Sequence, residues 1–117
     1  MQYAFLIYAS QATYATMTQE EYATLLQGYQ TFTNEVIERD IMKGGQQLQP
    51  PSTATTVRIR NADTLITDGP FAETKEHLAG YFVLNCKDLD EALALAKKMP
   101  DVQHGSIEVR PIVERSM

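Results

Sequence analysis

Hydrophobic and polar positions along the chain follow patterns that predict five strands. Segments 2–8 (QYAFLIY) and 81–86 (YFVLNC) are apolar at nearly every position, which is typical of strands buried on both faces. Segment 53–60 (TATTVRIR) alternates with a period of two, and segment 64–68 (TLITD) returns as its hairpin partner. Segment 106–113 (SIEVRPIV) is the last strand, with Ile, Val and Pro residues sharing one face.

Two helices are predicted between these strands. Thr18-x-x-Glu21 is a capping box that begins the first helix, and an apolar stripe with helical spacing follows it. Lys43-Gly44-Gly45 is expected to end this helix, because a cation suits its C-terminus and glycine allows the chain to reverse. The second helix begins at Asp88 and ends before Pro100.

The resulting order of elements is β-α-β-β-β-α-β, with segment 46–49 as an extra extended piece before Pro50-Pro51. This order predicts an α+β fold with an antiparallel sheet, the ferredoxin-like split βαβ arrangement. Two helices can cover only one face of such a sheet. The doubly apolar segments 2–8 and 81–86 therefore predict that a second copy of the chain covers the other face, which gives a homodimer with cavities between the two sheets.

Length and charge narrow the classes of function. The 117 residues fit a single domain, 1–117. The net charge is −5 and the ten Lys and Arg residues are scattered, so direct binding of nucleic acid is not expected. No apolar run is long enough to span a membrane, and the N-terminus lacks the basic start of a signal peptide. We expect a cytoplasmic protein.

Few residues suit metal or cofactor chemistry. Cys86 is the single cysteine and is expected in the core, which excludes a disulfide within the chain or a CxxC motif. His77 and His104 are the only histidines, and no pattern of metal ligands surrounds them. The sequence contains no glycine-rich phosphate loop, GxSxG or HExxH motif, so neither a metal nor a cofactor is expected.

Segment 67–77, TDGPFAETKEH, carries the candidate catalytic residues. Asp68 ends a strand before the rigid Gly69-Pro70 pair, where its carboxylate could accept hydrogen bonds from the turn or act as a general acid or base. The structural role is the simpler of the two. His77 is the residue of this segment whose side chain titrates near neutral pH, and it could be a base oriented by Asp68. A capping or surface histidine is the alternative.

Other side chains of this region are candidates for binding a substrate. Phe71 could stack on a ligand or anchor the loop, and Lys75 lies in a charged run with Glu73 that could equally be a solvated loop. Arg58 and Arg110 lie opposite the apolar faces of their strands. If those apolar faces meet the helices, both arginines point toward the dimer cavity and could bind a carboxylate or phosphate.

Arg110 has an alternative role in an ion pair with Glu108 or across strands, which would set the register of the dimer. Arg60 shares the arrangement of Arg58 on its strand.

Three segments together resemble a known family: GGQQLQPPSTATTVRIR, TDGPFAETKEHLAGYFVL and DLDEALALAKKMP…HGSIEVRPI. The chain resembles the DGPF subgroup of YCII-related (YciI-like) proteins from the first strand to Pro111. The resemblance implies a bacterial, cytoplasmic, dimeric α+β barrel. It also implies a His–Asp pair in a cleft and, for some members, association with an extracytoplasmic-function sigma factor. Asp68 matches the family aspartate, whereas the family histidine lies earlier and here no histidine precedes His77.

These observations lead to two hypotheses about function. The first is an enzyme that performs acid–base chemistry on a small organic acid or lactone in the dimer cavity. The second is a non-catalytic, ligand-binding or regulatory dimer that works with a sigma factor. A third reading assigns the loop charges only a solubilising role.

Overall fold

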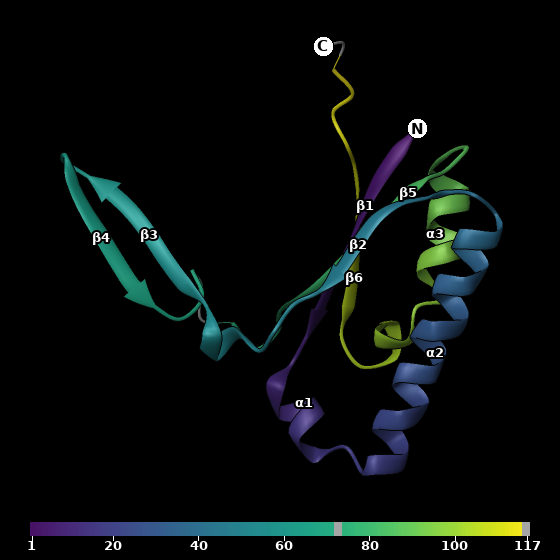
Figure 1. The fold of residues 1–117 in the computed structure, drawn as a ribbon, viewed down its shortest axis with the longest axis horizontal. Coiled ribbons are helices and arrows are strands. Elements are labelled where there is room, and N and C mark those ends of the chain that lie inside the picture. The colour runs from purple at the N-terminus through teal and green to yellow at the C-terminus, as the bar shows by residue number, and fades with distance from the viewer. Residues whose placement is uncertain (72–73, 116–117) are drawn as a thin grey trace.

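The computed structural model describes residues 1–71 and 74–115. Its elements in chain order, shown in Figure 1, are β1 (Gln2–Ala9), α1 (Gln11–Thr16), α2 (Gln19–Glu38), β2 (Met42–Gln47), the short 3₁₀ turn η1 (Pro51–Thr53), β3 (Thr55–Arg60), β4 (Asp63–Asp68), β5 (His77–Asn85), α3 (Leu89–Ala96), the 3₁₀ turn η2 (Pro100–Gln103) and β6 (Ser106–Pro111). The predicted α+β class, with a mostly antiparallel sheet, is confirmed.

The main sheet has four antiparallel strands in the order β2-β5-β1-β6. In this order the first and third strands of the core motif are neighbours, as in a ferredoxin-like fold. Helices α2 and α3 lie on one side of the sheet (Figure 1). Side chains on that side form the core, and Phe5 is the centre of one row because it pairs with Phe82 on β5 and with Val109 on β6.

Within residues 1–71 and 74–115, the other face of the sheet carries no helix (Figure 1). Alternate residues of β1 and β5, including Leu6, Tyr81 and Val83, point to this face and are only partly buried. Both faces of segments 2–8 and 81–86 thus carry apolar side chains, and burial of this second face by another copy of the chain stays a prediction. Glu108 and Arg110 also lie on this face, because they pair with Leu6 and Ala4 of β1.

Helix α2 begins where the sequence predicts. The Thr18 hydroxyl accepts a hydrogen bond from the Glu21 backbone N–H at 3.0 Å, and the Glu21 carboxylate accepts one from the Thr18 N–H at 2.9 Å. Its predicted end is wrong. The helix stops at Glu38, Asp40 adopts a left-handed φ of 56°, and Lys43-Gly44-Gly45 belongs to β2.

Strand β2 shows why this end was misplaced. Gly45 lets β2 approach β5 closely, since a Cβ atom at this position would lie 2.9 Å from the Tyr81 carbonyl oxygen. The Gly-Gly pair thus serves strand pairing, with a register shift between Met42 and Gly44, rather than helix termination. The short piece expected at 46–49 is in fact the end of a strand of the main sheet.

Strands β3 and β4 form a separate two-stranded sheet, which we call the arm. The prediction that they belong to the main sheet is wrong. Figure 1 shows the arm extending away from the helices. The radius of gyration, 16.2 Å, exceeds the value of about 13 Å for a compact domain of this length. The predicted turn is present: Asn61 and Ala62 both have positive φ, as a two-residue hairpin loop of type I′ requires.

One side of the arm is apolar. Val57 pairs with Ile66 across the two strands and shares a face with Ile59, and these side chains are 61%, 68% and 63% exposed. The condition that the apolar face of Val57 and Ile59 meets the helices is therefore not fulfilled. The argument that placed Arg58 in a cavity behind them fails with it.

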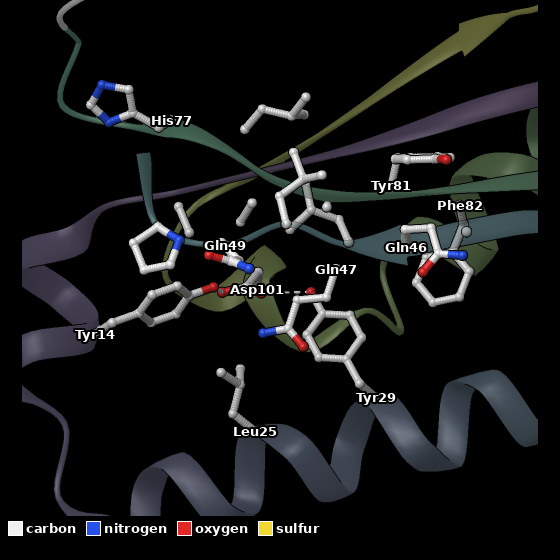
Figure 2. Close-up of a pocket in the computed structure, with 18 of the residues that line it drawn as sticks. Tyr14, Leu25, Tyr29, Gln46, Gln47, Gln49, His77, Tyr81, Phe82 and Asp101 are labelled. Carbon is white, nitrogen blue, oxygen red and sulfur yellow. Dashed lines mark hydrogen bonds between the residues drawn. The ribbon is translucent and has the colours of Figure 1, made fainter. Parts of the chain in front are cut away.

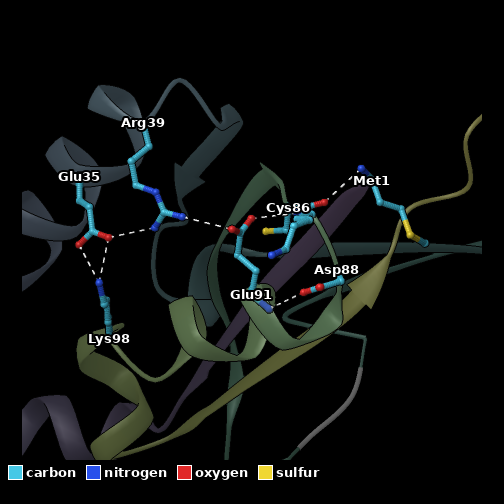
Figure 3. Close-up of polar contacts among 8 residues, drawn as sticks. Met1, Glu35, Arg39, Cys86, Asp88, Glu91 and Lys98 are labelled. Carbon is cyan, nitrogen blue, oxygen red and sulfur yellow. Dashed lines mark hydrogen bonds and ion pairs between the residues drawn. The ribbon is translucent and has the colours of Figure 1, made fainter.

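Helix α3 begins as predicted at Asp88, whose carboxylate accepts a hydrogen bond from the Glu91 N–H at 2.9 Å. Ion pairs join α2 to α3: Glu35 contacts Lys98 at 2.9 Å and Arg39 at 3.2 Å, and Arg39 reaches Glu91 at 3.4 Å (Figure 3). Cys86 is buried, as predicted.

Helix α1 was not predicted, because it contains no buried residue and hence no apolar stripe. No helix in residues 1–71 and 74–115 has the length and apolar character needed to cross a membrane.

Candidate functional site

A cleft of about 800 Å³ opens between α2 and the β2–β5 edge of the main sheet. Helix α1 and η1 contribute to its rim, and η2 contributes to its floor (Figure 2). Its walls include large apolar side chains that stay substantially exposed, namely Tyr22, Leu26, Leu48 and Leu78. Apolar side chains that line a concave surface, with a few polar groups among them, are typical of a binding site for a small molecule.

A buried carboxylate lies on the floor of this cleft. Asp101 is 1% exposed and accepts two hydrogen bonds, from the Tyr14 hydroxyl to Oδ1 at 2.9 Å and from the Tyr29 hydroxyl to Oδ2 at 2.6 Å. Figure 2 shows the three side chains converging from α1, α2 and η2. Because both oxygens accept a hydrogen bond from a tyrosine, the geometry fits the ionised form of the carboxyl group.

The carboxylate in turn keeps both tyrosines protonated. Burial is the largest cause that raises the pKa of Tyr14, and the charge of Asp101 and the hydrogen bond to it follow. Burial also raises the pKa of Tyr29, followed by the hydrogen bond to Asp101 and its charge. A tyrosinate on either residue would be desolvated and would face a negative charge, so both hydroxyls act as donors at neutral pH.

Two glycines allow these groups to meet. A Cβ atom on Gly28 would lie 2.7 Å from Cγ of Pro100, so glycine at this position lets α2 pack closely against η2. Tyr29 and Asp101 are the next residues along each segment. A Cβ atom on Gly105 would overlap the Tyr8 carbonyl oxygen, and the Gly105 N–H donates to the Asp101 backbone oxygen at 2.7 Å.

His77, predicted as a catalytic residue, lines the cleft. It pairs with Ala9 at the first residue of β5, beyond a register shift in β1. Its Nδ1 atom is buried and makes no hydrogen bond within the described residues. Figure 2 shows its ring pointing away from Asp101. His77 thus borders the cleft with one ring nitrogen that is buried and has no hydrogen-bond partner among the described residues.

Asp68, the other candidate catalytic residue, lies at the end of β4 on the arm and is exposed. It pairs with Thr55, and within the described part of the chain it is not among the residues that line the cleft. The following turn is held by the Gly69 N–H, which donates to the Ala54 carbonyl at 2.6 Å. A single chain therefore does not bring Asp68 and His77 together at this cleft.

The candidate binding residues lie outside the cleft, in two pairs. Arg58 lies over the Phe71 ring, 4.7 Å from its centroid, and its Nη2 is 3.5 Å from the Phe71 carbonyl oxygen. Arg110 forms an ion pair with Glu108 on the open face of the main sheet, which was the alternative role for this arginine.

Lys75 is exposed on the connection into β5, and Glu73 lies outside the described residues. The neighbouring Glu76 accepts a hydrogen bond from the Ser106 hydroxyl at 2.8 Å. The charged run of this segment is thus partly engaged with the end of β6.

Sequence reasoning missed Tyr14, Tyr29 and Asp101. Tyr29 is part of the apolar stripe of the first predicted helix, Tyr14 precedes the capping box that begins this helix, and Asp101 follows the proline that marks the end of the second helix. A buried aspartate without a nearby sequence partner has no periodic signal. The one available hint was the Pro-Asp pair before His104-Gly105, which is typical of an ordered turn.

The charge of the cleft is unusual for a site that would bind an acid. Its described lining contains neither lysine nor arginine, and Asp101 is its one carboxylate. Amide side chains of Gln46, Gln47 and Gln49 provide neutral polar groups along β2 and the segment after it (Figure 2). In the described parts of the chain, no three His, Cys, Asp or Glu residues gather as a metal site would require.

Comparisons with known proteins identify relatives over nearly the whole chain. A family model described as the YCII-related domain matches residues 1–116. An uncharacterised protein of Rhizobium meliloti (strain 1021) is 33% identical over 114 residues, which covers 96% of this chain and 92% of that protein.

Proposed function

The chain belongs to the family of YCII-related domains, whose model matches residues 1–116, and we propose that it binds a small organic molecule in the cleft between α2 and β5. We place it in the DGPF subgroup on the TDGPF sequence at 67–71. One observation carries the proposal of binding. A buried carboxylate held by two tyrosine hydroxyls lies at the floor of a cleft with exposed apolar walls.

Acid–base chemistry on the bound molecule is the function that this site supports best. His77 is its candidate base or acid, because imidazole titrates near neutral pH and the buried Nδ1 lacks a partner among the described residues. Asp101 is less suited to this role, since each of its oxygens already accepts a hydrogen bond from a tyrosine hydroxyl. In this proposal Asp101 fixes Tyr14 and Tyr29, and the tyrosine oxygens accept hydrogen bonds from the ligand.

The charges of the cleft favour a lactone over a free acid as substrate. A carboxylate ligand would lose its hydration without gaining a cation in the described lining, and Asp101 would repel it. An uncharged carbonyl compound avoids both costs. The side-chain amides of Gln46, Gln47 and Gln49 are suitable donors for its oxygen.

Screening a set of lactones and other small carbonyl compounds by ligand-detected NMR tests the binding proposal. Leu26→Trp, which would fill the cleft, is compared with Leu93→Trp on α3, since the two leucines are similarly exposed, 45% and 42%, and Leu93 lies outside the cleft lining. Binding that Leu26→Trp abolishes and Leu93→Trp retains supports the proposal. Compounds that bind both variants equally would place the ligand elsewhere.

Turnover of any bound compound is then compared between wild type and His77→Gln, which keeps a polar side chain and cannot titrate. A loss of at least a hundredfold is expected for a general acid or base. Binding without turnover in either protein would favour the second candidate, a non-catalytic dimer that signals through a sigma factor. That candidate is supported by the family resemblance and by the engagement of Asp101 with two tyrosines.

A homodimer remains part of the proposal, with both copies in the cytoplasm. Two surfaces support it: the uncovered face of the main sheet and the apolar side of the arm. Strand spacings give the sheet face and the arm together an area of roughly 600 Å², close to the ~800 Å² that a stable dimer buries on each partner. An isolated two-stranded hairpin is only marginally stable in water, so a second copy would also stabilise the arm.

A further inference from the structure

We infer that the molecule bound in this cleft carries a positively charged amino group, which the Tyr14–Asp101–Tyr29 cluster recognises. The inference rests on the proposed ligand-binding function and adds the chemical class of the ligand. It starts from the environment of Asp101, which is 1% exposed and lines the cleft.

The buried carboxylate lacks a counter-charge. Four ion pairs are found in the described part of the chain, and none includes Asp101. Its two oxygens accept hydrogen bonds from neutral hydroxyls only, at 2.9 and 2.6 Å. Buried charges in proteins are usually paired, so a carboxylate that is buried without a cation but borders a cleft is a suitable partner for a cationic ligand.

The orientation of the two tyrosine hydroxyls determines whether the cluster offers donors or acceptors to a ligand. Each hydroxyl hydrogen points to Asp101, which leaves each oxygen free to act as an acceptor, and both tyrosines line the cleft. An ammonium group has three N–H donors and no acceptor, which complements two tyrosine oxygens and the negative charge behind them. A carboxylate would present acceptors to these acceptors, whereas the carbonyl group of a ligand can meet the glutamine amides elsewhere in the cleft.

The rest of the cleft suits the body of such an amine. Tyr22, Tyr29 and Phe82 line it, and aromatic faces attract an ammonium group through the charge distribution of the ring. Leu25, Leu26, Leu48 and Leu78 supply apolar surface for an attached hydrocarbon group. The described lining also contains no lysine or arginine that would repel the cation.

Three probes of similar shape and different charge test the inference: benzylamine, benzyl alcohol and benzoate. Their dissociation constants at pH 7 are measured by NMR titration of the wild-type protein, of Asp101→Asn and of Asp63→Asn. The last variant removes the same charge from the hairpin turn of the arm, outside the cleft lining. Circular dichroism establishes that each variant is folded.

We expect wild type and Asp63→Asn to bind benzylamine at least tenfold more tightly than benzyl alcohol, about 1.4 kcal/mol, and benzoate most weakly. In Asp101→Asn the preference for benzylamine over benzyl alcohol should fall below about threefold. This corresponds to less than half of the free-energy difference expected for wild type. If wild type binds benzylamine no more tightly than benzyl alcohol, the inference that the ligand is a cation is wrong, and the proposal that the cleft binds a ligand stands. Failure of all three probes to bind at millimolar concentration also overturns the inference, whereas the lactone screen with Leu26→Trp and Leu93→Trp decides the proposed function separately. If Asp101→Asn does not fold, the three dissociation constants of the wild-type protein still test the inference.

Discussion

The Tyr29 hydroxyl donates a 2.6 Å hydrogen bond to Oδ2 of Asp101, which joins the middle of α2 to the turn between α3 and β6. The two residues are 72 positions apart in the chain. The contact fixes the floor of the cleft and the distance between a helix and the sheet. Its removal therefore tests the stability of the fold and the shape of the site together.

Tyr29→Phe should lower the free energy of unfolding by about 1.5–3 kcal/mol, because it leaves one oxygen of a buried carboxylate without its donor. Urea denaturation measures the change. Tyr3→Phe is the control, since the Tyr3 hydroxyl donates to Met1 Sδ at 3.6 Å, a weak contact near the N-terminus. Equal losses in the two variants would contradict a special role for the Asp101 contact.

The Tyr14–Asp101–Tyr29 cluster should make stability fall at alkaline pH. The pKa of each tyrosine is raised in the folded protein, so the cluster's contribution is fully present below the unfolded pKa of about 10 and is lost as pH rises above it. Tyrosinate absorbance followed against pH should show a late step that unfolding accompanies. Tyr14→Phe and Tyr29→Phe should each reduce its amplitude, and an unchanged titration in both would refute the assignment.

Gly105→Ala should destabilise the protein by more than about 2 kcal/mol, since the new Cβ atom would overlap the Tyr8 carbonyl oxygen and force β1 away from η2. Gly44→Ala is the matched control, because a Cβ atom there has no neighbour within 4 Å. That substitution should be neutral or slightly stabilising. Thermal unfolding of the two variants measures the difference, and similar midpoints would count against the close approach at Gly105.

Glu35→Gln should weaken the contact between α2 and α3 by about 0.5–1 kcal/mol at low salt, the range for partly exposed ion pairs. The hydrogen bond from Lys98, followed by that from Arg39, lowers the pKa of Glu35. Its contribution is thus present above the unfolded pKa and is lost as pH falls through the lower folded value. Glu38→Gln is the control on the same helix. Denaturation of both variants at two pH values and two salt concentrations shows whether the loss of stability is specific to Glu35. A loss that high salt leaves unchanged would argue against the ion pair.

Ile66→Lys should weaken the proposed dimer at least tenfold, because it places a charge on the apolar side of the arm. Thr67→Lys adds the same charge to the opposite side of the arm and should leave association unchanged. Sedimentation at micromolar concentration measures the mass of each protein. A wild-type species of only 13.1 kDa would exclude the dimer.

Local sequence signals determined the class of fold and most of its elements. The two main helices begin where capping chemistry predicts, at the pairs Thr18–Glu21 and Asp88–Glu91. The sequence could predict these starts because a cap involves residues only three positions apart. The doubly apolar segments 2–8 and 81–86 became the adjacent central strands β1 and β5. His77 was singled out from residue type alone, and the structure places it in the lining of the cleft.

Tertiary structure decided which strands share a sheet and which residues make the site. Lys43-Gly44-Gly45 ends a helix by local rules, but it pairs with β5 because glycine permits the close approach that this strand needs. In strands β3 and β4, apolar and polar residues alternate as they would in a strand of the main sheet. In the folded chain, however, β2 takes the edge position beside β5, and β3 and β4 pair only with each other. Asp101, Tyr14 and Tyr29 come from three segments without a common motif. Their hydrogen bonds exist because packing brings η2 against α1 and α2, and no local sequence pattern encodes such a long-range contact.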